Sequence, residues 1–513
     1  MPSVVELSPA PLTPAEVIAV ARADAQVEIG RHALAAIARA AERIEMLGRS
    51  PDPVYGVSTG FGALATRHIP PQSRARLQRS LIRSHAAGSG PPVEREVVRA
   101  MMLLRLHTVA TGYTGVRRTT ALAYAQLLNA GLTPVVPEFG SLGCSGDLAP
   151  LAHVALALMG EGEVSDGQRL LPASEALAAA GLASVELTAK EGLALINGTD
   201  GMLGMLILAC TDIHLLATTV DLSAAMSVEA LLGTDRVFAE DLQALRPHPG
   251  QAAAAANMRR LLAGSPVMDS HRGPDCHLVQ DAYSLRCAPQ VAGALRDTLD
   301  HAETVAGREL AAAVDNPVVL ADGRVESNGN FHGAPLGYVL DFLAIAVADV
   351  ASMSERRTDR MLDAGRSHGL PPFLAHDAGV DSGHMIAQYT QAAIVSEMRR
   401  LAVPASVDSL PSSAMQEDHV SLGWSAARKL RRSLDGLTRV LAIEVLTAAR
   451  ALDLRAPLAP APATAAVIGA LRAHVPGPGP DRWLAPEIER AVSMVADGSL
   501  LAAAASSLGA PLL

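Results

Sequence analysis

The chain has 513 residues, of which 49% are hydrophobic and only 3% aromatic, and its formal net charge is −10. An acidic protein repels nucleic acid and anionic membranes, so neither is expected as a partner. The length suggests about three domains. The abundance of Ala and Leu favours helices around a core of small aliphatic side chains.

Four cysteines, Cys144, Cys210, Cys276 and Cys287, show no C-x-x-C spacing, so a disulfide framework is not expected. The first 22 residues contain several Pro and Glu residues and no basic segment leading into an apolar one, so no signal peptide is predicted. No uncharged apolar run approaches the roughly 18 residues of a membrane-spanning helix. We therefore expect a cytoplasmic protein without a membrane span.

Helical patterns fill most of the first 130 residues. Two helices are predicted over residues 13–47, with Gly48 as the stop signal of the second. A glycine-rich loop follows at Tyr55–Gly62, and loops of this kind often carry function. Further helices are predicted over residues 72–87, 93–111 and 115–130.

A second glycine-rich turn, Gly143-Cys144-Ser145-Gly146, precedes an apolar helix predicted from Leu148 to Met159. The two glycines lack the side-chain barrier to unusual backbone angles, so the backbone between them can fold tightly. The nitrogen of Gly146 could then reach the carbonyl carbon of Cys144. Ring closure with loss of water, including the Ser145 hydroxyl, would give a methylidene-imidazolone (MIO), a strong electrophile made from the chain itself.

The 143–146 turn also has simpler interpretations. A Gly/Ser turn before a helix is usually only structural, and composition alone favours that interpretation. The turn is not a nucleophile elbow, because G-x-S-x-G requires glycine where Asp147 stands. It is not a phosphate-binding loop either, because no Lys follows the glycines.

The remainder of the chain is still more helical. Short β-hairpins are predicted at Asp166-Gly167 and Asp322-Gly323, and helical stretches over residues 191–232 and 278–314. Two long apolar stripes follow at helical spacing, and they indicate a bundle of near-parallel helices: Leu340, Leu343, Val347 and Val350, then Leu430, Leu434, Leu437, Leu441, Val445, Ala448 and Leu452. Proline-rich segments at 456–463 and 476–480 set apart a small terminal helical piece.

Polar motifs interrupt the apolar helices. Asn197 lies in Ile196–Thr199, and on a helix Gln280, Tyr283 and Arg286 would share one face, where the guanidinium suits bidentate capture of a carboxylate. Two further groups lack a recognised helical ligand spacing, so no metal site is predicted at either: Glu417, Asp418 and His419, and His271, Asp275, Cys276 and His277.

These motifs together resemble the histidine and aromatic amino-acid ammonia-lyases, and the resemblance spans nearly the whole chain. It runs through Tyr55–Gly62, Leu77–His85, the 143–146 turn, Asn197-Gly198-Thr199, the Gln280–Arg286 segment, Asn330-Phe331-His332 and Gln416–His419. Most members have Ala where Cys144 stands, a tolerable change because that residue contributes mainly its carbonyl and Cα to the ring. Met415, Asp200 and Ala282 also depart from the common pattern, at positions without a proposed catalytic role.

The resemblance implies a mainly α fold with a long central helical bundle (aspartase/fumarase-like), a few short β-hairpins and a homotetramer with composite active sites. We expect an N-terminal helical domain over residues 1–198 that carries the MIO turn. The bundle domain would cover residues 199–513, with the small helical piece after about residue 456. No diffusible cofactor or metal is expected beyond the MIO from Cys144, Ser145 and Gly146.

The resemblance also implies residue roles. Tyr55 would remove the β-proton of the substrate, and Asn197 would support the ring oxygen. Arg286 would clamp the carboxylate, with Gln280 and Tyr283 beside it. Phe331 would be an active-site aromatic residue.

Substrate choice is implied by two further positions. The pair Ser84-His85 is typical of histidine-acting members, where phenylalanine- and tyrosine-acting relatives carry Phe-Leu or His-Leu. Glu417 matches the glutamate that faces the imidazole ring. A carboxylate and a histidine suit an imidazole, which donates and accepts hydrogen bonds, and they suit a phenyl ring poorly.

The sequence therefore predicts elimination of ammonia from L-histidine to give trans-urocanate, the first step of histidine degradation. Two alternatives stay open at this point. One is a phenylalanine or tyrosine ammonia-lyase, or an aminomutase, that uses the same ring. The other is a non-catalytic helical scaffold, which the presence of Tyr55, Ser145, Asn197, Tyr283 and Arg286 disfavours.

Overall fold

The computed structural model describes residues 2–49, 53–60, 62–64, 66–188, 190–273 and 279–513. Phe61 of the first glycine-rich loop and Asp275, Cys276 and His277 of the second polar group lie outside the described residues. The chain forms two compact units, each built from three stretches. Unit 1 comprises Met1–Leu208, Ala302–Asp341 and Pro404–Arg428; unit 2 comprises Ala209–His301, Phe342–Val403 and Lys429–Leu513. The predicted domain division near residue 198 stays a prediction.

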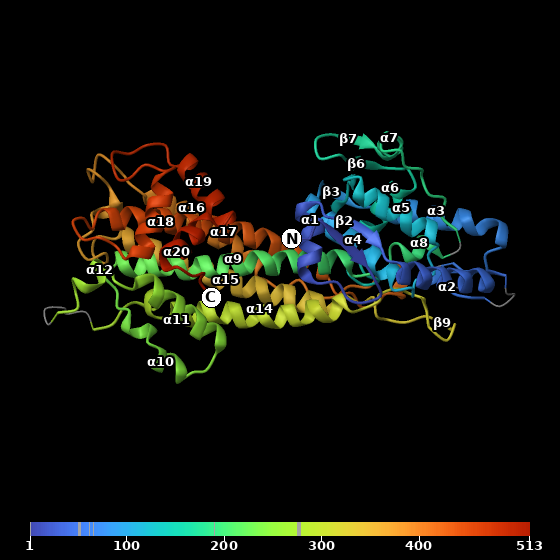
Figure 1. Cartoon of the computed structure of the whole chain (residues 1–513), viewed down its shortest axis with the longest axis horizontal. Coiled ribbons are helices and arrows are strands. Elements are labelled where there is room, and N and C mark those ends of the chain that lie inside the picture. The colour runs from blue at the N-terminus through green and yellow to red at the C-terminus, as the bar shows by residue number, and fades with distance from the viewer. Residues whose placement is uncertain (1, 50–52, 61, 65, 189, 274–278) are drawn as a thin grey trace. The chain divides into compact units, whose positions relative to one another are not determined.

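Unit 1 carries most of the short elements (Figure 1). Its helices and short 3-10 turns are α1 (Pro14–Ala23), α2 (Arg31–Gly48), η1 (Gly62–Leu64), η2 (Pro71–Ser73), α3 (Arg74–His85), α4 (Arg95–Ala110), α5 (Arg118–Asn129), α6 (Leu148–Leu158), α7 (Ala173–Ala179), α8 (Glu191–Ala194) and η5 (Ser413–Met415). Its strands are β1 (Val4–Leu7), β2 (Gln26–Ile29), β3 (Ser89–Pro92), β4 (Thr133–Pro134), β5 (Pro137–Phe139), β6 (Glu163–Ser165), β7 (Leu170–Pro172), β8 (Val318–Val319) and β9 (Val325–Glu326).

Unit 2 is helical. It contains η3 (Arg236–Phe238), α10 (Glu240–Ala244), α11 (Pro249–Leu262), α12 (Pro266–Asp269), α13 (Tyr283–Arg286), η4 (Pro372–Leu374), α16 (Met385–Leu401), α18 (Pro462–Arg472), α19 (Ala485–Ala496) and α20 (Ser499–Leu508). Four long helices run through both units: α9 (Asp200–Ala230), α14 (Ala288–Leu310), α15 (Ala334–Leu362) and α17 (Gly423–Asp453).

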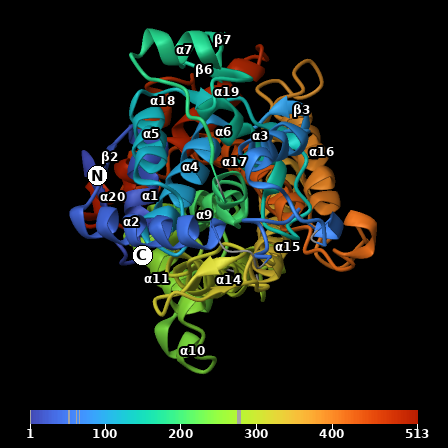
Figure 2. The ribbon, with the colours of Figure 1, turned by 90° about the vertical axis from the view of Figure 1, so that its right-hand side faces the viewer.

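Local sequence signals explain several of these boundaries. Thr13 caps α1 through a reciprocal pair with Glu16, in which the Glu16 amide donates to the Thr13 hydroxyl and the Thr13 amide donates to the Glu16 carboxylate. In α6, eight of the eleven residues are buried, as its apolar sequence requires. Helices α4, α5 and α6 pack beside one another in unit 1 (Figure 2).

Both predicted hairpins are present. β6 pairs antiparallel with β7, and β8 pairs antiparallel with β9. In the first turn Asp166 accepts hydrogen bonds from the amides of Gln168 and Arg169 at 2.9 and 2.8 Å, which closes the loop. Three pairings were not predicted: β1 with β2 in parallel, β3 with β5, and β4 with β6. Strands of two to four residues are too short for hydrophobic alternation to reveal them.

Buried polar contacts join the four long helices within unit 2. The Glu444 carboxylate on α17 accepts hydrogen bonds from Ser227 on α9 and from Ser354 and Arg357 on α15. On α14, Arg296 forms an ion pair with Asp221 of α9 at 2.6 Å. The predicted mainly α fold with a long helical bundle is therefore confirmed.

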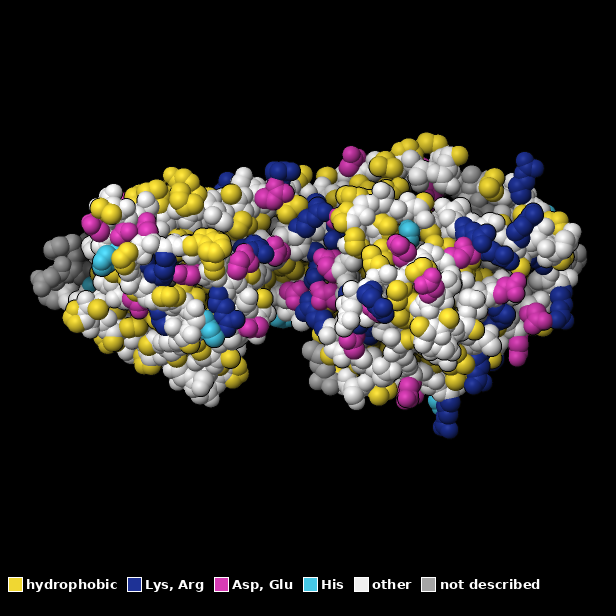
Figure 3. Space-filling view, turned by 90° about the horizontal axis from the view of Figure 1, so that it is seen from above, with side chains coloured by type: hydrophobic (Ala, Val, Ile, Leu, Met, Phe, Trp, Pro, Cys, Tyr) yellow, Lys and Arg dark blue, Asp and Glu magenta, His cyan; other side chains and the backbone are white. Residues whose placement is uncertain are grey.

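Two of these helices have the length and hydropathy of a membrane span, although no uncharged run in them is that long. They are α9 and α15. In the most apolar 18-residue stretch of each helix, 72% of α9 and 61% of α15 is buried within the protein. Burial in the protein interior explains this apolar composition. On the face drawn in Figure 3, acidic and basic side chains are interspersed among apolar ones.

The predicted helix over residues 278–314 needs correction. Helix α13 begins only at Tyr283, and Gln280 lies before it in a segment, 279–282, that is neither helix nor strand. That segment is held away from helical geometry because the Asp281 carboxylate accepts the Thr234 amide at 2.7 Å. Gln280 therefore does not share a helix with Tyr283 and Arg286.

Candidate active site

The 143–146 turn connects β5 to α6, and its backbone can be built only with glycine. Gly143 and Gly146 have φ values of +67° and +72°. A Cβ atom on Gly146 would lie 2.1 Å from the carbonyl oxygen of Gly198, and one on Gly143 would lie 2.3 Å from the Ser421 hydroxyl. Both positions therefore combine left-handed backbone with a contact too close for any side chain.

Segments distant in sequence hold the turn. The Gly143 carbonyl accepts hydrogen bonds from the Ser421 hydroxyl at 2.8 Å and from the Gly333 amide at 3.1 Å. The Leu142 carbonyl accepts the Leu422 amide at 2.9 Å. These contacts fix the backbone entering the turn, so its conformation is set by the tertiary structure of unit 1.

Asp147 fixes the other end of the turn. Its amide donates to the Gly198 carbonyl at 2.7 Å, and its carboxylate accepts the Gly201 and Met202 amides at 2.9 Å each. The Ser141 hydroxyl donates to the same carboxylate at 2.8 Å. Burial raises the pKa of Asp147 to about 7, although these hydrogen bonds oppose the shift.

Cys144 is buried beside Glu417. Its thiol lies 3.2 Å from a Glu417 carboxylate oxygen, and the Ser145 hydroxyl donates to the other oxygen at 3.3 Å. Burial, helped by the charge of Glu417, raises the pKa of Cys144 to about 12. A thiol with that pKa is neutral near pH 7 and lacks the thiolate character of a nucleophile.

A cavity of about 600 Å³ opens beside the turn, and every residue that lines it belongs to unit 1. It brings together five residues that the sequence singled out, from five separate segments: Tyr55, His85, Ser145, Asn197 and Glu417. Each of these side chains is half-buried or buried. Cys144 and Gly146 flank Ser145 in the turn itself.

His85 and Tyr55 each contribute a hydrogen-bonding group to the cavity. The Nδ1 atom of His85 lies 2.9 Å from the Leu81 carbonyl oxygen, which can only accept, so Nδ1 carries the proton and Nε2 is the acceptor of the neutral ring. Burial lowers the pKa of His85, which favours that neutral form. The phenol oxygen of Tyr55 accepts the Gly62 amide at 3.3 Å.

Asn197 is buried with one half of its amide unpaired. Its Nδ2 donates to the Asn316 carbonyl at 3.3 Å, whereas its Oδ1 has no protein partner. A buried acceptor without a partner is unfavourable. Since Asn197 lines the cavity, the free oxygen is suited to a donor group on a bound molecule.

Glu417 is held by a strained turn. The Ser412 amide donates to the Glu417 carbonyl at 2.8 Å, and the Ser412 hydroxyl donates to its carboxylate at 3.0 Å. Between them Ser413, Ala414 and Met415 have φ values of +51°, +52° and +69°. Such angles are costly for residues other than Gly or Asn, and strain of this kind is concentrated at functional sites.

Besides Cys144 and Gly146, four predicted site residues do not line this cavity. Gln280, Tyr283 and Arg286 belong to unit 2, where the Arg286 guanidinium lies 4.7 Å from the centre of the Tyr283 ring and 68% of Tyr283 is exposed. Phe331 belongs to unit 1 and is half-buried, next to His332, whose ring stacks on His419.

Sequence reasoning missed Asn316 and Ser413, which also line the cavity. Asn316 precedes Pro317, and a residue before proline favours extended backbone. The sequence signal for Asn316 was the run Asp315-Asn316-Pro317 after a long predicted helix. Ser413 lies three residues before the Gln416–His419 motif. Neither residue has a spacing that identifies a role by itself.

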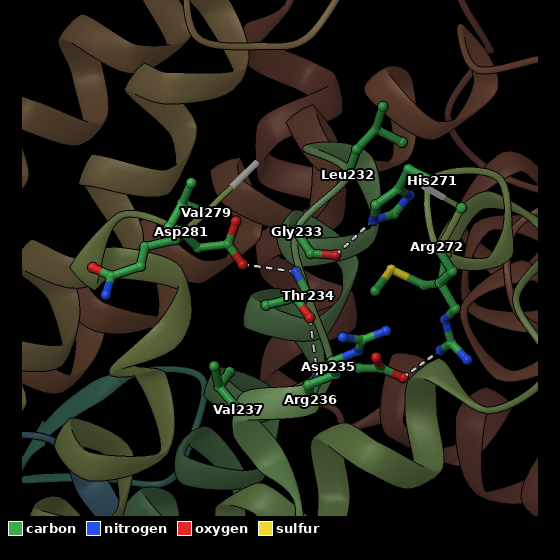
Figure 4. A pocket seen from close by; sticks show the side chains of 13 residues that line it. Leu232, Gly233, Thr234, Asp235, Arg236, Val237, His271, Arg272, Val279 and Asp281 are labelled. Carbon is green, nitrogen blue, oxygen red and sulfur yellow. Dashed lines mark hydrogen bonds and ion pairs between the residues drawn. The ribbon is translucent and has the colours of Figure 1, made fainter. Parts of the chain in front are cut away.

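A second cavity, of about 350 Å³, lies in unit 2 (Figure 4). Gln280, Val279 and Asp281 contribute to its wall, and its charged groups largely engage one another or the backbone. Arg272 pairs with Asp235 at 2.6 Å, and Asp281 accepts the Thr234 amide. Within the described part of the chain, no cluster of His, Cys, Asp or Glu side chains is arranged to hold a metal ion.

Comparisons with known proteins agree with the geometry. A family model described as aromatic amino acid lyase matches residues 12–473. The chain is 66% identical to the histidine ammonia-lyase of Streptomyces coelicolor over 501 residues, which is 97% of this chain and 98% of that protein.

Solved structures with the same fold include a tyrosine aminomutase from Streptomyces globisporus, with a TM-score of 0.93, 38% identity and full coverage of both chains. The histidine ammonia-lyase from Trypanosoma cruzi has a TM-score of 0.89 and 36% identity, and the match covers 98% of this chain and 95% of that one.

Gly143→Ala should disrupt the turn more than a glycine substitution that introduces backbone strain alone. Gly131 provides the control, because its φ is +72° but a Cβ there meets nothing within 4 Å. We expect Gly131→Ala to cost about 1 kcal/mol and Gly143→Ala to cost at least roughly 1 kcal/mol more, because overpacking adds to strain. Urea unfolding of both variants checks this; equal midpoints would contradict the role of the Ser421 contact.

Proposed function

The chain belongs to the aromatic amino acid lyase family, and on this premise we propose that it removes ammonia from L-histidine to give trans-urocanate. The observation that carries the proposal is the cavity that gathers Tyr55, His85, Asn197 and Glu417 around Ser145. The histidine ammonia-lyase that shares 66% of its residues with this chain supports the choice of amino acid.

We infer that Cys144, Ser145 and Gly146 close into an MIO. The Gly146 nitrogen bonds to the Cys144 carbonyl carbon, and the carbonyl oxygen leaves as water with the amide hydrogens of Ser145 and Gly146. The Ser145 hydroxyl then leaves with its α-hydrogen as a second water. The residues present fit this group, because two glycines at positive φ bracket the turn and the neighbouring thiol is neutral and buried.

Ring closure would also free Glu417 for the substrate. In the open chain the Ser145 hydroxyl donates to one carboxylate oxygen of Glu417, and Ser412 donates to the other. Loss of the Ser145 hydroxyl as water removes the first of these donors. That oxygen can then accept an imidazole N–H, while Nε2 of His85 accepts a second donor.

Elimination requires a base and a better leaving group at the same time. The MIO supplies an electrophilic carbon that makes the substrate's amino group a better leaving group. Tyr55 takes the β-proton, the C–H electron pair forms the Cα=Cβ bond, and the Cα–N bond breaks to release ammonia. Asn197 offers its unpaired Oδ1 to a donor on the substrate.

We propose that the carboxylate clamp belongs to a composite active site formed by several copies of the chain. Gln280, Tyr283 and Arg286, which lie in unit 2, would supply this clamp. A homotetramer with composite active sites is supported by the apolar side chains that α15 leaves exposed at spacings of four and three: Tyr338, Phe342 and Ile345, at 59%, 48% and 46%. Phe331 is proposed to contribute an aromatic surface in that assembly. A cytoplasmic location stays a prediction.

The nearest alternative is action on tyrosine, because the fold is similar to that of a tyrosine aminomutase. Glu417 and His85 argue against it. A phenol can donate to only one of the two acceptors, Glu417 and Nε2 of His85, and a phenyl ring can donate to neither, whereas a protonated imidazole ring can donate to both. A polar group left without a partner in a closed site is costly.

Purified protein should convert L-histidine to urocanate and ammonia, because Glu417 and His85 are matched to an imidazole. Ultraviolet absorbance of the product, with L-phenylalanine and L-tyrosine in parallel, checks this. Cinnamate or coumarate formed without urocanate would overturn the substrate assignment and leave the lyase chemistry in place.

Ser145→Ala should abolish turnover, with a loss of at least roughly 10³-fold, because the ring cannot form its methylidene group without the serine hydroxyl. Intact mass should show wild-type protein lighter than its sequence by two waters, whereas the variant should not lose the second water. The control is the elution volume of the oligomer, which should be unchanged. Substantial turnover by a well-folded variant would contradict the MIO mechanism.

Glu417→Gln should lower kcat/KM for L-histidine by roughly 10- to 1000-fold, because a neutral amide accepts the imidazole N–H less strongly than a carboxylate. Asp418→Asn is the matched control, since Asp418 is exposed and does not line the cavity. Steady-state kinetics with L-histidine measure both variants. Equal values of kcat/KM would exclude Glu417 from the substrate contact.

A further inference from the structure

Arg105 is a charged residue in the middle of α4, in an otherwise apolar run, and its side chain is 0% exposed. Its guanidinium forms a fork between two backbone carbonyls. Nη1 donates to the Asn197 carbonyl and Nη2 donates to the Val314 carbonyl, each at 2.7 Å. Burial of a charged arginine side chain has a large desolvation free energy, so packing alone does not explain an arginine at this position.

The two carbonyls belong to two segments that meet at the cavity. Asn197 lines the cavity directly, and Val314 lies two residues before Asn316, which also lines it. On the cavity side a hydrogen bond of 3.3 Å joins the segments, from Asn197 Nδ2 to the Asn316 carbonyl. The guanidinium therefore joins the same two segments by two shorter hydrogen bonds.

The backbone at Gly198 packs closely against the Arg105 guanidinium. A Cβ on Gly198 would lie 2.7 Å from Arg105 Nη1 and 2.4 Å from the Asp200 carboxylate. Asp200 lies 3.4 Å from Arg105 Nε and provides the compensating charge. Burial raises the pKa of Asp200, and the Arg105 charge acts in the opposite direction. The 197–200 segment thus rests directly on the guanidinium.

We propose that Arg105 is a positioning residue that fixes Asn197 and Asn316 relative to each other in the cavity wall, because its guanidinium donates to a backbone carbonyl of each of the two segments. The proposal rests on the proposed function only through the role of Asn197 in the site. The same segment reaches the turn, because the Gly198 carbonyl accepts the Asp147 amide at 2.7 Å. A shift of the segment would therefore move Asn197 relative to Ser145.

Lysine cannot replace this fork. An ammonium keeps the positive charge that Asp200 needs, but it is a point donor on a flexible stem and does not bridge two carbonyls in fixed planar geometry. Arg105→Lys therefore separates the charge of Arg105 from its geometry. We expect kcat for L-histidine to fall by roughly 10- to 100-fold, because misplacement of a site group by about 1 Å has an effect of that size.

Arg99 on the same helix provides a matched control. It is also buried, at 2% exposure, and it donates to two backbone carbonyls, those of Val20 at 2.9 Å and Leu128 at 3.1 Å. Neither of these residues lines the cavity. Arg99→Lys should lower the thermal midpoint as Arg105→Lys does, while leaving kcat and KM within about two-fold of wild type.

The double variant Arg105→Gln/Asp200→Asn covers the case in which Arg105→Lys does not fold. It removes the charges of Arg105 and Asp200 together, so neither charge is left buried without its partner. It also lacks the guanidinium that donates to the two carbonyls. The measurements on all variants are kcat, KM, thermal midpoint and the intact-mass loss of two waters. We expect the double variant to share the fall in kcat, with KM changed less than kcat.

Two results would overturn the positioning role: unchanged kcat in folded Arg105→Lys and in the double variant, or an equal fall in kcat for Arg99→Lys. A wild-type protein that does not act on L-histidine would count against the proposed function instead. In that case the intact mass still tests the role of Arg105. We expect the displaced segment to slow ring closure, so that part of the Arg105→Lys protein keeps the full mass of its sequence. Complete closure there would also contradict the proposal.

Discussion

The contact on which the site depends is the approach of Gly146 to Gly198. With only 2.1 Å between a hypothetical Cβ at 146 and the Gly198 carbonyl oxygen, the turn and the 197–200 segment are in direct backbone contact. No side chain fits between them, so the position of one determines the position of the other. The Asp147 amide, which donates to the same carbonyl, holds this contact closed.

In each unit, a buried arginine donates a hydrogen bond to the backbone of a segment that carries predicted site residues. In unit 1, Arg105 donates to the Asn197 carbonyl, and in unit 2 the Arg357 guanidinium, paired with Glu444, donates to the Ser284 carbonyl at 3.3 Å. Ser284 lies between Tyr283 and Arg286 on the single turn of α13. A short helical turn has little stability of its own, so a buried partner is what orients it.

The sequence predicted the helices and the turn well because both depend on local signals. Helical periodicity identified the long helices, and the paired glycines identified the turn. It could not place Gln280 correctly, since the segment that contains Gln280 is tied to a distant part of the chain by a hydrogen bond to Asp281 from Thr234, 47 residues earlier. For the same reason Asn316 and Arg105 were missed: their roles arise from segments that tertiary folding brings together, and no spacing within one segment reveals them.

The division of site residues between the two units has a chemical consequence. The groups in the cavity of unit 1 can form hydrogen bonds to a polar ring and remove a proton, but no arginine or lysine other than Arg67 lines that cavity among the described residues. An α-amino acid also carries a carboxylate, and a bidentate arginine is the side chain best suited to it. Arg286 is exposed enough to be offered to another molecule, and its stacking on Tyr283 keeps the guanidinium and the phenol together. An assembly that inserts this pair into the cavity of another copy would supply the carboxylate clamp and a second phenol in one step, so activity would depend on association of the subunits.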